Sequence, residues 1–349
     1  MPESLIPLPP DFARRMVLWQ REHGRQHLPW QATADPYRVW LSEIMLQQTQ
    51  VSTVLDYYPR FLQRFPDVLA LAGAPLDDVL SLWSGLGYYS RARNLHRCAQ
   101  KVVEQWGGRF PGCAADLQTL PGIGRSTAAA IAAFCFRERV AILDGNVKRV
   151  LGRVLAYGAD LSVPAHERQL WSLAEQLLPS AAADMPAYTQ AVMDLGATVC
   201  LPRKTGCELC PVAGLCEARQ QNQPLAFPVK TRKLKRSSVT CWLLWAVNAK
   251  GQVWMQKRPA RGIWAGLYAL PVLDSEEALL AAWPHAKVEQ YIEPWVHVLT
   301  HRDLHLHPVR MRGPARTPPG VEGQWIDAQN LSALGLPKPV RQLICEERH

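Results

Sequence analysis

No apolar run in this chain of 349 residues is long enough to cross a membrane. The longest one, from Thr127 to Phe136, is far shorter than the roughly 20 apolar residues that span a bilayer. The opening stretch MPESLIPLPPDFARRM carries an acidic residue and several prolines, and it lacks the apolar core of a secretion signal. Internal repeats and low-complexity tracts are absent as well. The sequence therefore favours a cytoplasmic globular protein with no membrane partner, and its length predicts two domains.

Acidic residues are fewer than basic ones. The chain has 39 lysines and arginines against 30 aspartates and glutamates, which gives a net charge of +9. A balance of this sign favours polyanionic partners such as DNA. A generic basic surface has the same composition, so charge alone does not decide between these two interpretations.

The sequence has no disulfide framework, because five of its nine cysteines stand singly: Cys98, Cys113, Cys135, Cys241 and Cys345. Without a secretion signal, such scattered thiols indicate a reducing compartment. The other four follow the spacing Cys200-x6-Cys207-x2-Cys210-x5-Cys216. Four thiolates this close can hold a [4Fe–4S] cluster or a zinc ion. Two C-x-x-C pairs would favour zinc, but only one such pair is present and the spacings are unequal.

Helical patterning covers the first part of the chain. From Asp11 to about Arg219, apolar residues recur at intervals of three and four, and Asp35-Pro36 is a typical helix start. Around Pro224 this pattern gives way to the basic, proline-rich stretch PLAFPVKTRKLKRSS, which is followed by strands such as VTCWLLWAV and LHLHPVRM and by a helix over KPVRQLICEE. We expect an all-α domain over residues 1–222, a basic linker over 223–237 and an α+β domain over 238–349.

The stretch LPGIGRSTAAAI, residues 120–131, places two glycines in front of an alanine-rich helix. Gly122 and Gly124 permit positive φ angles and the close approach of another chain. The free amides of the first helical turn form an anion site. Because the preceding LQTL is also predicted to be helical, the unit is a helix-hairpin-helix, which holds a DNA phosphate through backbone amides. An ordinary corner between two helices is the common alternative.

Several long motifs point to one family. LPWQATADPYRVWLSEIMLQQTQV, SGLGYYSRARNLH and ILDGNVKRV, together with the hairpin and the cysteine spacing, resemble the endonuclease III superfamily of DNA glycosylases and, within it, the MutY-type adenine DNA glycosylases. The resemblance implies a monomeric base-excision-repair enzyme that hydrolyses the N-glycosidic bond of adenine opposite 8-oxoguanine or guanine in double-stranded DNA. It also implies that Cys200, Cys207, Cys210 and Cys216 hold a [4Fe–4S] cluster.

Ser126 distinguishes two reaction types within the superfamily. Endonuclease III relatives have a lysine two residues after the second hairpin glycine, where it attacks C1′ of the sugar and forms an imine that leads to strand cleavage. Serine cannot form an imine, so the resemblance implies base removal with at most weak strand cleavage. Ser126 therefore argues against the alternative of a bifunctional pyrimidine glycosylase and lyase.

Two acidic residues form the candidate catalytic pair, which argues against a non-enzymatic DNA-damage binder. Glu43 has mostly apolar helical neighbours, namely Val39, Trp40, Leu46 and Gln47. A carboxyl on an apolar face favours its neutral form and can donate a proton to N7 of adenine. Asp144 ends the apolar run VAIL and precedes a helix, where it is either an ordinary N-cap or a carboxylate beside an oxocarbenium-like sugar. The resemblance makes Glu43 the acid, Asp144 the stabiliser or nucleophile, and Asn146 the residue that orients water or Asp144.

The resemblance also implies a set of DNA contacts. Leu28, Trp30 and Gln190 match base-pocket positions, and Arg25 stands in the same short motif as the first two. Gln47, Gln48 and Tyr88 match residues that intercalate or lie in the minor groove. Gly122, Gly124 and Ser126 belong to the hairpin. Lys148 is either a phosphate contact or part of a solvated helix face.

The C-terminal strands, with RPARGIWAGLYALP, resemble a Nudix-type fold. A Nudix hydrolase has a helix with several metal-binding glutamates, whereas DSEEALLAAWPH retains only Glu276 and Glu277 and lacks the arginine-glutamate pattern, so we expect no phosphohydrolase activity. The resemblance implies that this domain recognises 8-oxoguanine opposite the adenine. Where the family has Phe-Ser-His, this chain has Leu299-Thr300-His301, which leaves the strength of that discrimination open.

Overall fold

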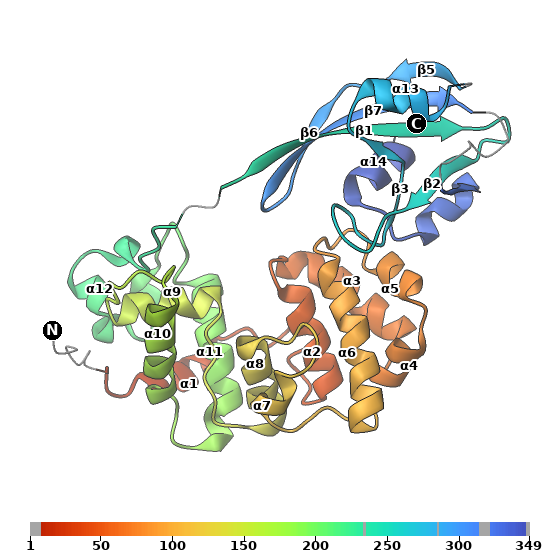
Figure 1. The fold of residues 1–349 in the computed structure, drawn as a ribbon. Helices are drawn as coiled ribbons and strands as arrows, with labels where there is room; N and C mark the ends of the chain where they lie inside the picture. The colour runs from red at the N-terminus through yellow and green to blue at the C-terminus, as the bar shows by residue number, and fades with distance from the viewer. Residues whose placement is uncertain (1–7, 233–234, 285, 314–321, 347–349) are drawn as a thin grey trace. The chain divides into compact units, whose positions relative to one another are not determined.

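The computed structural model describes residues 8–232, 235–284, 286–313 and 322–346 (Figure 1). Its contacts divide the chain into two compact units. The first runs to Ala72 and resumes at Arg97–Arg232, and the second joins Gly73–His96 to the chain from Lys233 onwards. The first seven residues of the opening stretch and Lys233-Leu234 of the predicted linker lie outside the described residues. The predicted domain limits therefore stay a prediction.

The first unit is helical, as the sequence predicts. Its main helices are α1 (Phe12–His23), α2 (Pro36–Leu46), α3 (Val51–Arg64), α4 (Val68–Gly73), the later part of α6 (Ser90–Trp106), α7 (Ala114–Leu117), α8 (Arg125–Phe136), α9 (Gly145–Val154), α10 (Pro164–Gln176), α11 (Met185–Thr198) and α12 (Glu217–Gln220). The predicted start of α2 is confirmed, because Asp35 is its N-cap and accepts a hydrogen bond from the backbone N–H of Tyr37.

Helix α8 is buried on all sides. Its alanines and its isoleucine are inaccessible to solvent, namely Ala128, Ala129, Ala130, Ile131, Ala132 and Ala133. Small side chains let neighbouring helices approach closely, and α8 contacts both α2 and α11. Helix α9 packs on α11 in turn. The alanine-rich sequence of α8 therefore lets α2 and α11 pack closely against the same helix.

The hairpin before α8 differs in part from its prediction. The preceding helix, α7, ends at Leu117, because Thr119 turns the chain back with its hydroxyl donating to the carbonyl of Asp116 at 2.7 Å. Leu117 is thus the last helical residue of the LQTL stretch, and the three residues after it form a turn. Gly122 has a φ of +79°, whereas Gly124 is the extended N-cap of α8 with a φ of −85°. Only Gly122 uses the left-handed conformation that glycine permits.

The described residues of the second unit form a mixed eight-stranded sheet. Five of its strands follow the order β3-β2-β1-β7-β5, and β4, β6 and β8 pair with β1, β7 and β2 beside this path. Its strands are β1 (Ser237–Val247), β2 (Val253–Lys257), β3 (Tyr268–Ala269), β4 (Val272–Leu273), β5 (Lys287–Tyr291), β6 (Trp295–Val298), β7 (Arg302–Arg312) and β8 (Gln324–Ile326). The two long strands β1 and β7 pair in parallel, and the other pairs are antiparallel. Helices α13 (Glu276–Ala282) and α14 (Lys338–Glu346) complete the predicted α+β fold (Figure 1).

Residues 73–96 belong to this second unit because side chains bind them to it. They carry α5 (Leu76–Leu82) and the start of α6. The hydroxyls of Ser84 and Tyr89 both donate to the carbonyl of Leu336, and Arg93 donates to the carbonyl of Ala265 at 2.7 Å. These contacts join a segment from the middle of the helical sequence to the C-terminal sheet.

Among the described residues, we find no helix whose length and hydropathy would suit a membrane span.

Gly196 provides a test of the packing between α9 and α11. A Cβ atom at Gly196 would lie 2.8 Å from the Cβ of Asn146 in the first turn of α9. Because a contact this short forces the two helices apart, we expect Gly196→Ala to lower the free energy of unfolding by about 1–3 kcal/mol in urea titrations. Gly73→Ala is the matched control, since a Cβ there meets no atom within 4 Å. Equal stability of the two variants would contradict this packing.

Candidate active site

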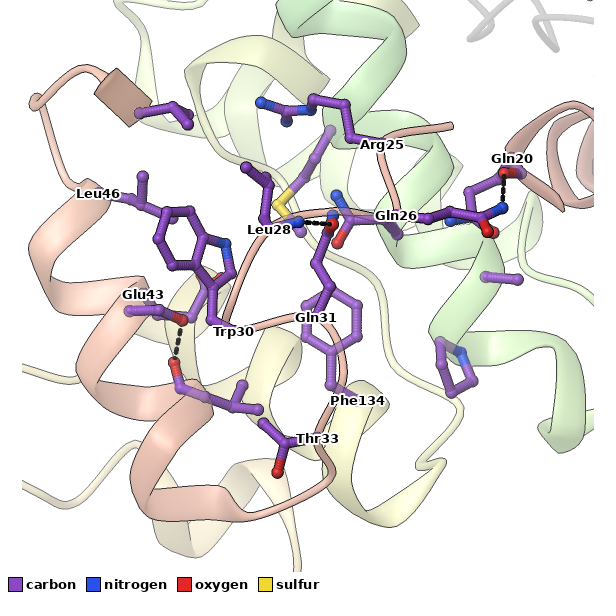
Figure 2. Close-up of a pocket in the computed structure, with 17 residues that line it drawn as sticks. Gln20, Arg25, Gln26, Leu28, Trp30, Gln31, Thr33, Glu43, Leu46 and Phe134 are labelled. Carbon is purple, nitrogen blue, oxygen red and sulfur yellow. Dashed lines mark hydrogen bonds between the residues drawn. The ribbon is translucent and has the colours of Figure 1, made fainter. Parts of the chain in front are cut away.

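A pocket of about 430 Å³ opens in the first unit (Figure 2). The loop between α1 and α2 contributes Leu28 and Trp30, α2 contributes Glu43, and α8 contributes Phe134. Both Leu28 and Trp30 are buried, at 3% and 7% exposure. The volume lies in the range of small-molecule sites and suits one planar base. The structure thus brings together five of the predicted site residues, namely Arg25, Leu28, Trp30, Glu43 and Gln190.

The carboxyl of Glu43 has little access to bulk water. The side chain is half-buried, and it lines the pocket, so the surface it exposes faces the recess. Burial, and to a smaller extent the negative charge of Asp144, raise the pKa of Glu43 to about 7. This is the environment that the apolar neighbours on α2 predict. A carboxyl with such a pKa carries a proton in a large fraction of molecules near neutral pH.

Asp144 and Asn146 stand at the start of α9. Asp144 is its N-cap and accepts from the backbone N–H of Val147 at 2.8 Å, so the N-cap interpretation is confirmed. Arg149, one turn further on, donates to Oδ1 of Asn146 at 2.8 Å, to the carbonyl of Gly196 and to the carbonyl of Cys200. The sequence analysis did not identify Arg149. Its spacing of three residues from Asn146 on a helix could have indicated this contact.

Ser126 has a structural contact that the sequence did not predict. Its hydroxyl oxygen accepts from the backbone N–H of Leu143 at 3.1 Å. Leu143 directly precedes Asp144, so the first turn of α8 holds the chain that leads into α9. The serine at the position of the superfamily's lysine therefore also fixes the approach to the candidate carboxylate.

A second buried carboxylate, Asp194, lies beside the pocket. It is 0% exposed and accepts from the backbone N–H and the guanidinium of Arg25 and from Nε2 of Gln190. Gln31, also at the pocket, accepts from the backbone N–H of Leu28, and its buried Nε2 has no hydrogen-bond partner in the described part of the chain. Both residues were missed, although Gln190 and Asp194 stand four apart on one helix face.

Three predicted DNA contacts lie at helix ends. Gln47 is the C-cap of α2 and donates to the hydroxyl of Thr127 at 3.4 Å. Gln48 follows it, is exposed and has a φ of +57°. Lys148 forms an ion pair with Glu167 at 2.8 Å, which favours the interpretation of a helix-face residue with an acidic neighbour.

In the second unit, Tyr88 meets the loop between β6 and β7. Its backbone has a φ of +49° after the positive φ angles of Gly85 and Gly87, and its hydroxyl is hydrogen-bonded to that of Thr300 at 2.8 Å. Thr300 and His301 are exposed, whereas Leu299 is half-buried and its backbone N–H donates to the carbonyl of Arg302.

The four clustered cysteines surround a small cavity of about 30 Å³ with apolar walls. The buried guanidinium of Arg153 donates to Sγ of Cys200 at 3.2 Å and to the carbonyl of Leu201. Burial, as the main cause, and the three other thiols together raise the pKa of Cys210 to about 12. Within the described ranges, no three Cys, His, Asp or Glu side chains are arranged to hold a single metal ion.

Comparisons with known proteins agree with these features. The family described as "HhH-GPD superfamily base excision DNA repair protein" matches residues 41–176, and the NUDIX domain family matches residues 242–346, which confirms the Nudix-like assignment. A solved thermostable thymine-DNA glycosylase is 28% identical with a TM-score of 0.53, over 60% of this chain and 95% of that one. An endonuclease III in a DNA complex has the same fold, at 18% identity and a TM-score of 0.51, over 60% and 94%.

Curated relatives extend the similarity over the whole chain. An adenine DNA glycosylase of Buchnera aphidicola subsp. Baizongia pistaciae is 35% identical over 95% of each chain. The adenine DNA glycosylase of Homo sapiens is 41% identical over 76% of this chain and 58% of its own length. Such identity over nearly the full length of both chains establishes that this protein belongs to the adenine DNA glycosylase family.

Proposed function

We propose that this protein hydrolyses the N-glycosidic bond of adenine that stands opposite 8-oxoguanine or guanine in double-stranded DNA. The observation that carries the proposal is the half-buried Glu43 carboxyl, with a pKa of about 7, in the wall of a pocket that suits one base. The family membership supports the choice of adenine. The target base must leave the duplex to reach such a pocket.

Glu43 is the general acid in this mechanism. Its proton passes to N7 of adenine, so the electrons of the bond between C1′ and N9 can move into the ring as that bond breaks. Trp30 and Leu28 form apolar walls that exclude water from the acid. The step leaves neutral adenine, an ionised Glu43 and a sugar with oxocarbenium character. A water molecule then adds to C1′ and gives up a proton to a carboxylate, which restores the acid and completes the hydrolysis.

Asp144 stabilises the positive charge that develops on the sugar. Its carboxylate lies at the N-terminus of α9, and one oxygen already accepts from Val147, which fixes its direction. Asn146 orients the attacking water or Asp144, and Arg149 holds the Asn146 side chain by its Oδ1. A protonated carboxyl beside an ionised one is the arrangement that glycoside hydrolysis requires.

Ser126 makes the reaction monofunctional. Its hydroxyl is bound to the backbone of Leu143 and cannot form an imine with C1′. The reaction therefore ends at an abasic site, which breaks only under alkali.

Cys200, Cys207, Cys210 and Cys216 hold a [4Fe–4S] cluster in this proposal. Four thiols around one apolar cavity fit it, and the Arg153 guanidinium is an N–H donor to the sulfur of Cys200. Each cysteine of such a cluster binds a different iron, whereas zinc needs all four sulfurs about 2.3 Å from one point. When bound, the cluster supplies an electron-transfer or structural centre next to α9, and Arg149 links its loop to Asn146.

Tyr88, Thr300 and His301 recognise the opposite base. Two of them already share a hydrogen bond, and the exposed His301 lies beside it. The family membership supports 8-oxoguanine as the lesion.

The proposed reaction is tested by single-turnover excision from duplexes with A opposite 8-oxoguanine, G or T, followed by alkali. We expect rapid loss of adenine from the first two duplexes and strand cleavage only after alkali. Glu43→Gln keeps the shape but removes the proton, so its rate should fall by about 10²–10⁴-fold while mispair binding is retained. Cleavage before alkali would indicate a lyase, and no cleavage would indicate a binding protein. A near-normal rate for Glu43→Gln would contradict its role as the acid.

The pH dependence of that rate follows from the pKa of Glu43. Only the protonated carboxyl can donate, and its pKa is raised from 4.5 to about 7. We therefore expect the excision rate to be highest below about pH 7 and to fall by up to tenfold per pH unit above it. Duplex affinity measured at each pH is the control for binding. A rate that rises through pH 7 to 9 would show that the ionised form of Glu43 is the active one.

Metal analysis tests the cysteine cluster. Protein purified without oxygen should be brown and contain about four iron and four sulfide per chain. Cys210→Ser should lower that content, whereas Cys113→Ser, at a half-buried cysteine outside the cluster, should leave it unchanged. One zinc per chain without iron would overturn the assignment.

A further inference from the structure

The loop from Ser84 to Tyr89 is bound at both ends to one backbone carbonyl, that of Leu336 just before α14. We propose that Tyr89 is a positioning residue: through Leu336 it sets where the loop presents Tyr88, and so how strongly the protein distinguishes 8-oxoguanine from guanine. The inference rests on the proposed function, because it assumes that Tyr88 lies against the base opposite the adenine.

The shape of this loop is fixed from within. Gly85, Gly87 and Tyr88 have φ angles of +105°, +75° and +49°. The buried guanidinium of Arg91 donates to the carbonyls of Leu86 and Gly87 at 3.4 and 3.2 Å. It also lies 5.4 Å from the centre of the Tyr88 ring. Because a positive φ is strained for tyrosine, these contacts help to hold Tyr88 in place within the loop. Where the loop lies therefore decides where Tyr88 lies.

Contacts outside the loop fix its placement. The hydroxyl of Tyr89 donates to the carbonyl of Leu336 at 2.8 Å and accepts from the backbone N–H of Gly85 at 3.3 Å. At the other end of the loop, the hydroxyl of Ser84 donates to the same carbonyl at 2.9 Å and accepts from Nε of Arg341 at 3.1 Å. Leu336 is inaccessible to solvent. A buried carbonyl that loses its donors is costly, so both hydroxyls hold the loop against this point.

The same placement brings Tyr88 to the loop between β6 and β7. The hydroxyl of Tyr88 is hydrogen-bonded to that of Thr300 at 2.8 Å, while 42% of the residue stays exposed and open to a partner. Hydrogen bonds between hydroxyls span only about 2.5–3.0 Å, so a small shift of the loop breaks this contact. Tyr89 turns its own hydroxyl to Leu336 instead. It therefore acts on the opposite base only through the position of Tyr88.

Removal of the Tyr89 hydroxyl tests the inference. Single-turnover excision of adenine opposite 8-oxoguanine and opposite guanine is measured with the full chain, and the ratio of the two rates is compared between variants. We expect Tyr89→Phe to lower this ratio by about two- to tenfold, which corresponds to one hydrogen bond. Tyr291→Phe is the matched control. The hydroxyl of Tyr291 donates to Glu276 at 2.7 Å in the same unit, and its removal should leave the ratio unchanged.

A double-mutant cycle separates positioning from stability. Thr300→Val removes the contact that the loop placement serves, so adding Tyr89→Phe to it should lower the ratio further by no more than about twofold. A residue that only stabilised the fold would have the same effect in both backgrounds. Ser84→Ala releases the other end of the loop and should lower the ratio in the wild-type background, as Tyr89→Phe does.

The outcomes distinguish this inference from the proposed function. If wild-type protein excises no adenine, the proposed function is wrong and the inference is overturned with it. If wild-type protein excises adenine equally fast opposite both bases, the proposed reading of the opposite base is wrong, and Tyr89 has no such role. If wild-type protein prefers 8-oxoguanine and Tyr89→Phe keeps that preference, or lowers it equally with and without Thr300, the Tyr89 hydroxyl supports only the fold.

Discussion

Keeping the Glu43 carboxyl away from bulk water is the constraint on which the rest of the first unit depends. In water its pKa would leave almost no proton on it near neutral pH, whereas burial and the nearby Asp144 raise that pKa to about 7. Desolvation of this kind needs apolar walls, and Leu28 and Trp30 from the α1–α2 loop and Phe134 from α8 supply them. Burial, together with the charge of Asp144, thus favours the protonated form of the carboxyl.

The close packing comes from small residues. The alanines of α8 allow α2 and α11 to contact the same helix, so Glu43 and Gln190 share one pocket. Gly196 allows α11 to lie against the first turn of α9, where Asn146 stands. Ser126, at the start of α8, holds the backbone just before Asp144. The positions of Glu43 and Asp144 therefore depend on small residues of neighbouring helices at the points where the helices touch.

Features of the fold and the site that depend on neighbouring residues could be predicted from the sequence, whereas contacts between residues far apart in the chain could not. The caps at Asp35 and Asp144 and the apolar surroundings of Glu43 could be predicted, because each depends on residues within a few positions. Asp194 could not, since its partner Arg25 lies 169 residues away, and Tyr88 meets Thr300 across 212 residues. Helix periodicity contains no information about such partners. Helix periodicity also predicted a helix through Leu120, whereas α7 ends at Leu117 and is followed by a turn in which the hydroxyl of Thr119 donates to the carbonyl of Asp116.

The first unit holds two carboxyls near the same pocket, those of Asp194 and Glu43, and their surroundings differ in the hydrogen-bond donors that they provide. Asp194 has a guanidinium, a backbone N–H and an amide as donors, so its charge is compensated where it stands. Glu43 has apolar walls and a negative neighbour instead, so the form without charge is favoured. A compensated carboxylate orients the groups around it, whereas an uncompensated one holds a proton that it can give away. Whether a carboxyl at this site accepts hydrogen bonds from its neighbours or donates a proton therefore depends on the donors that surround it, and not on the carboxyl itself.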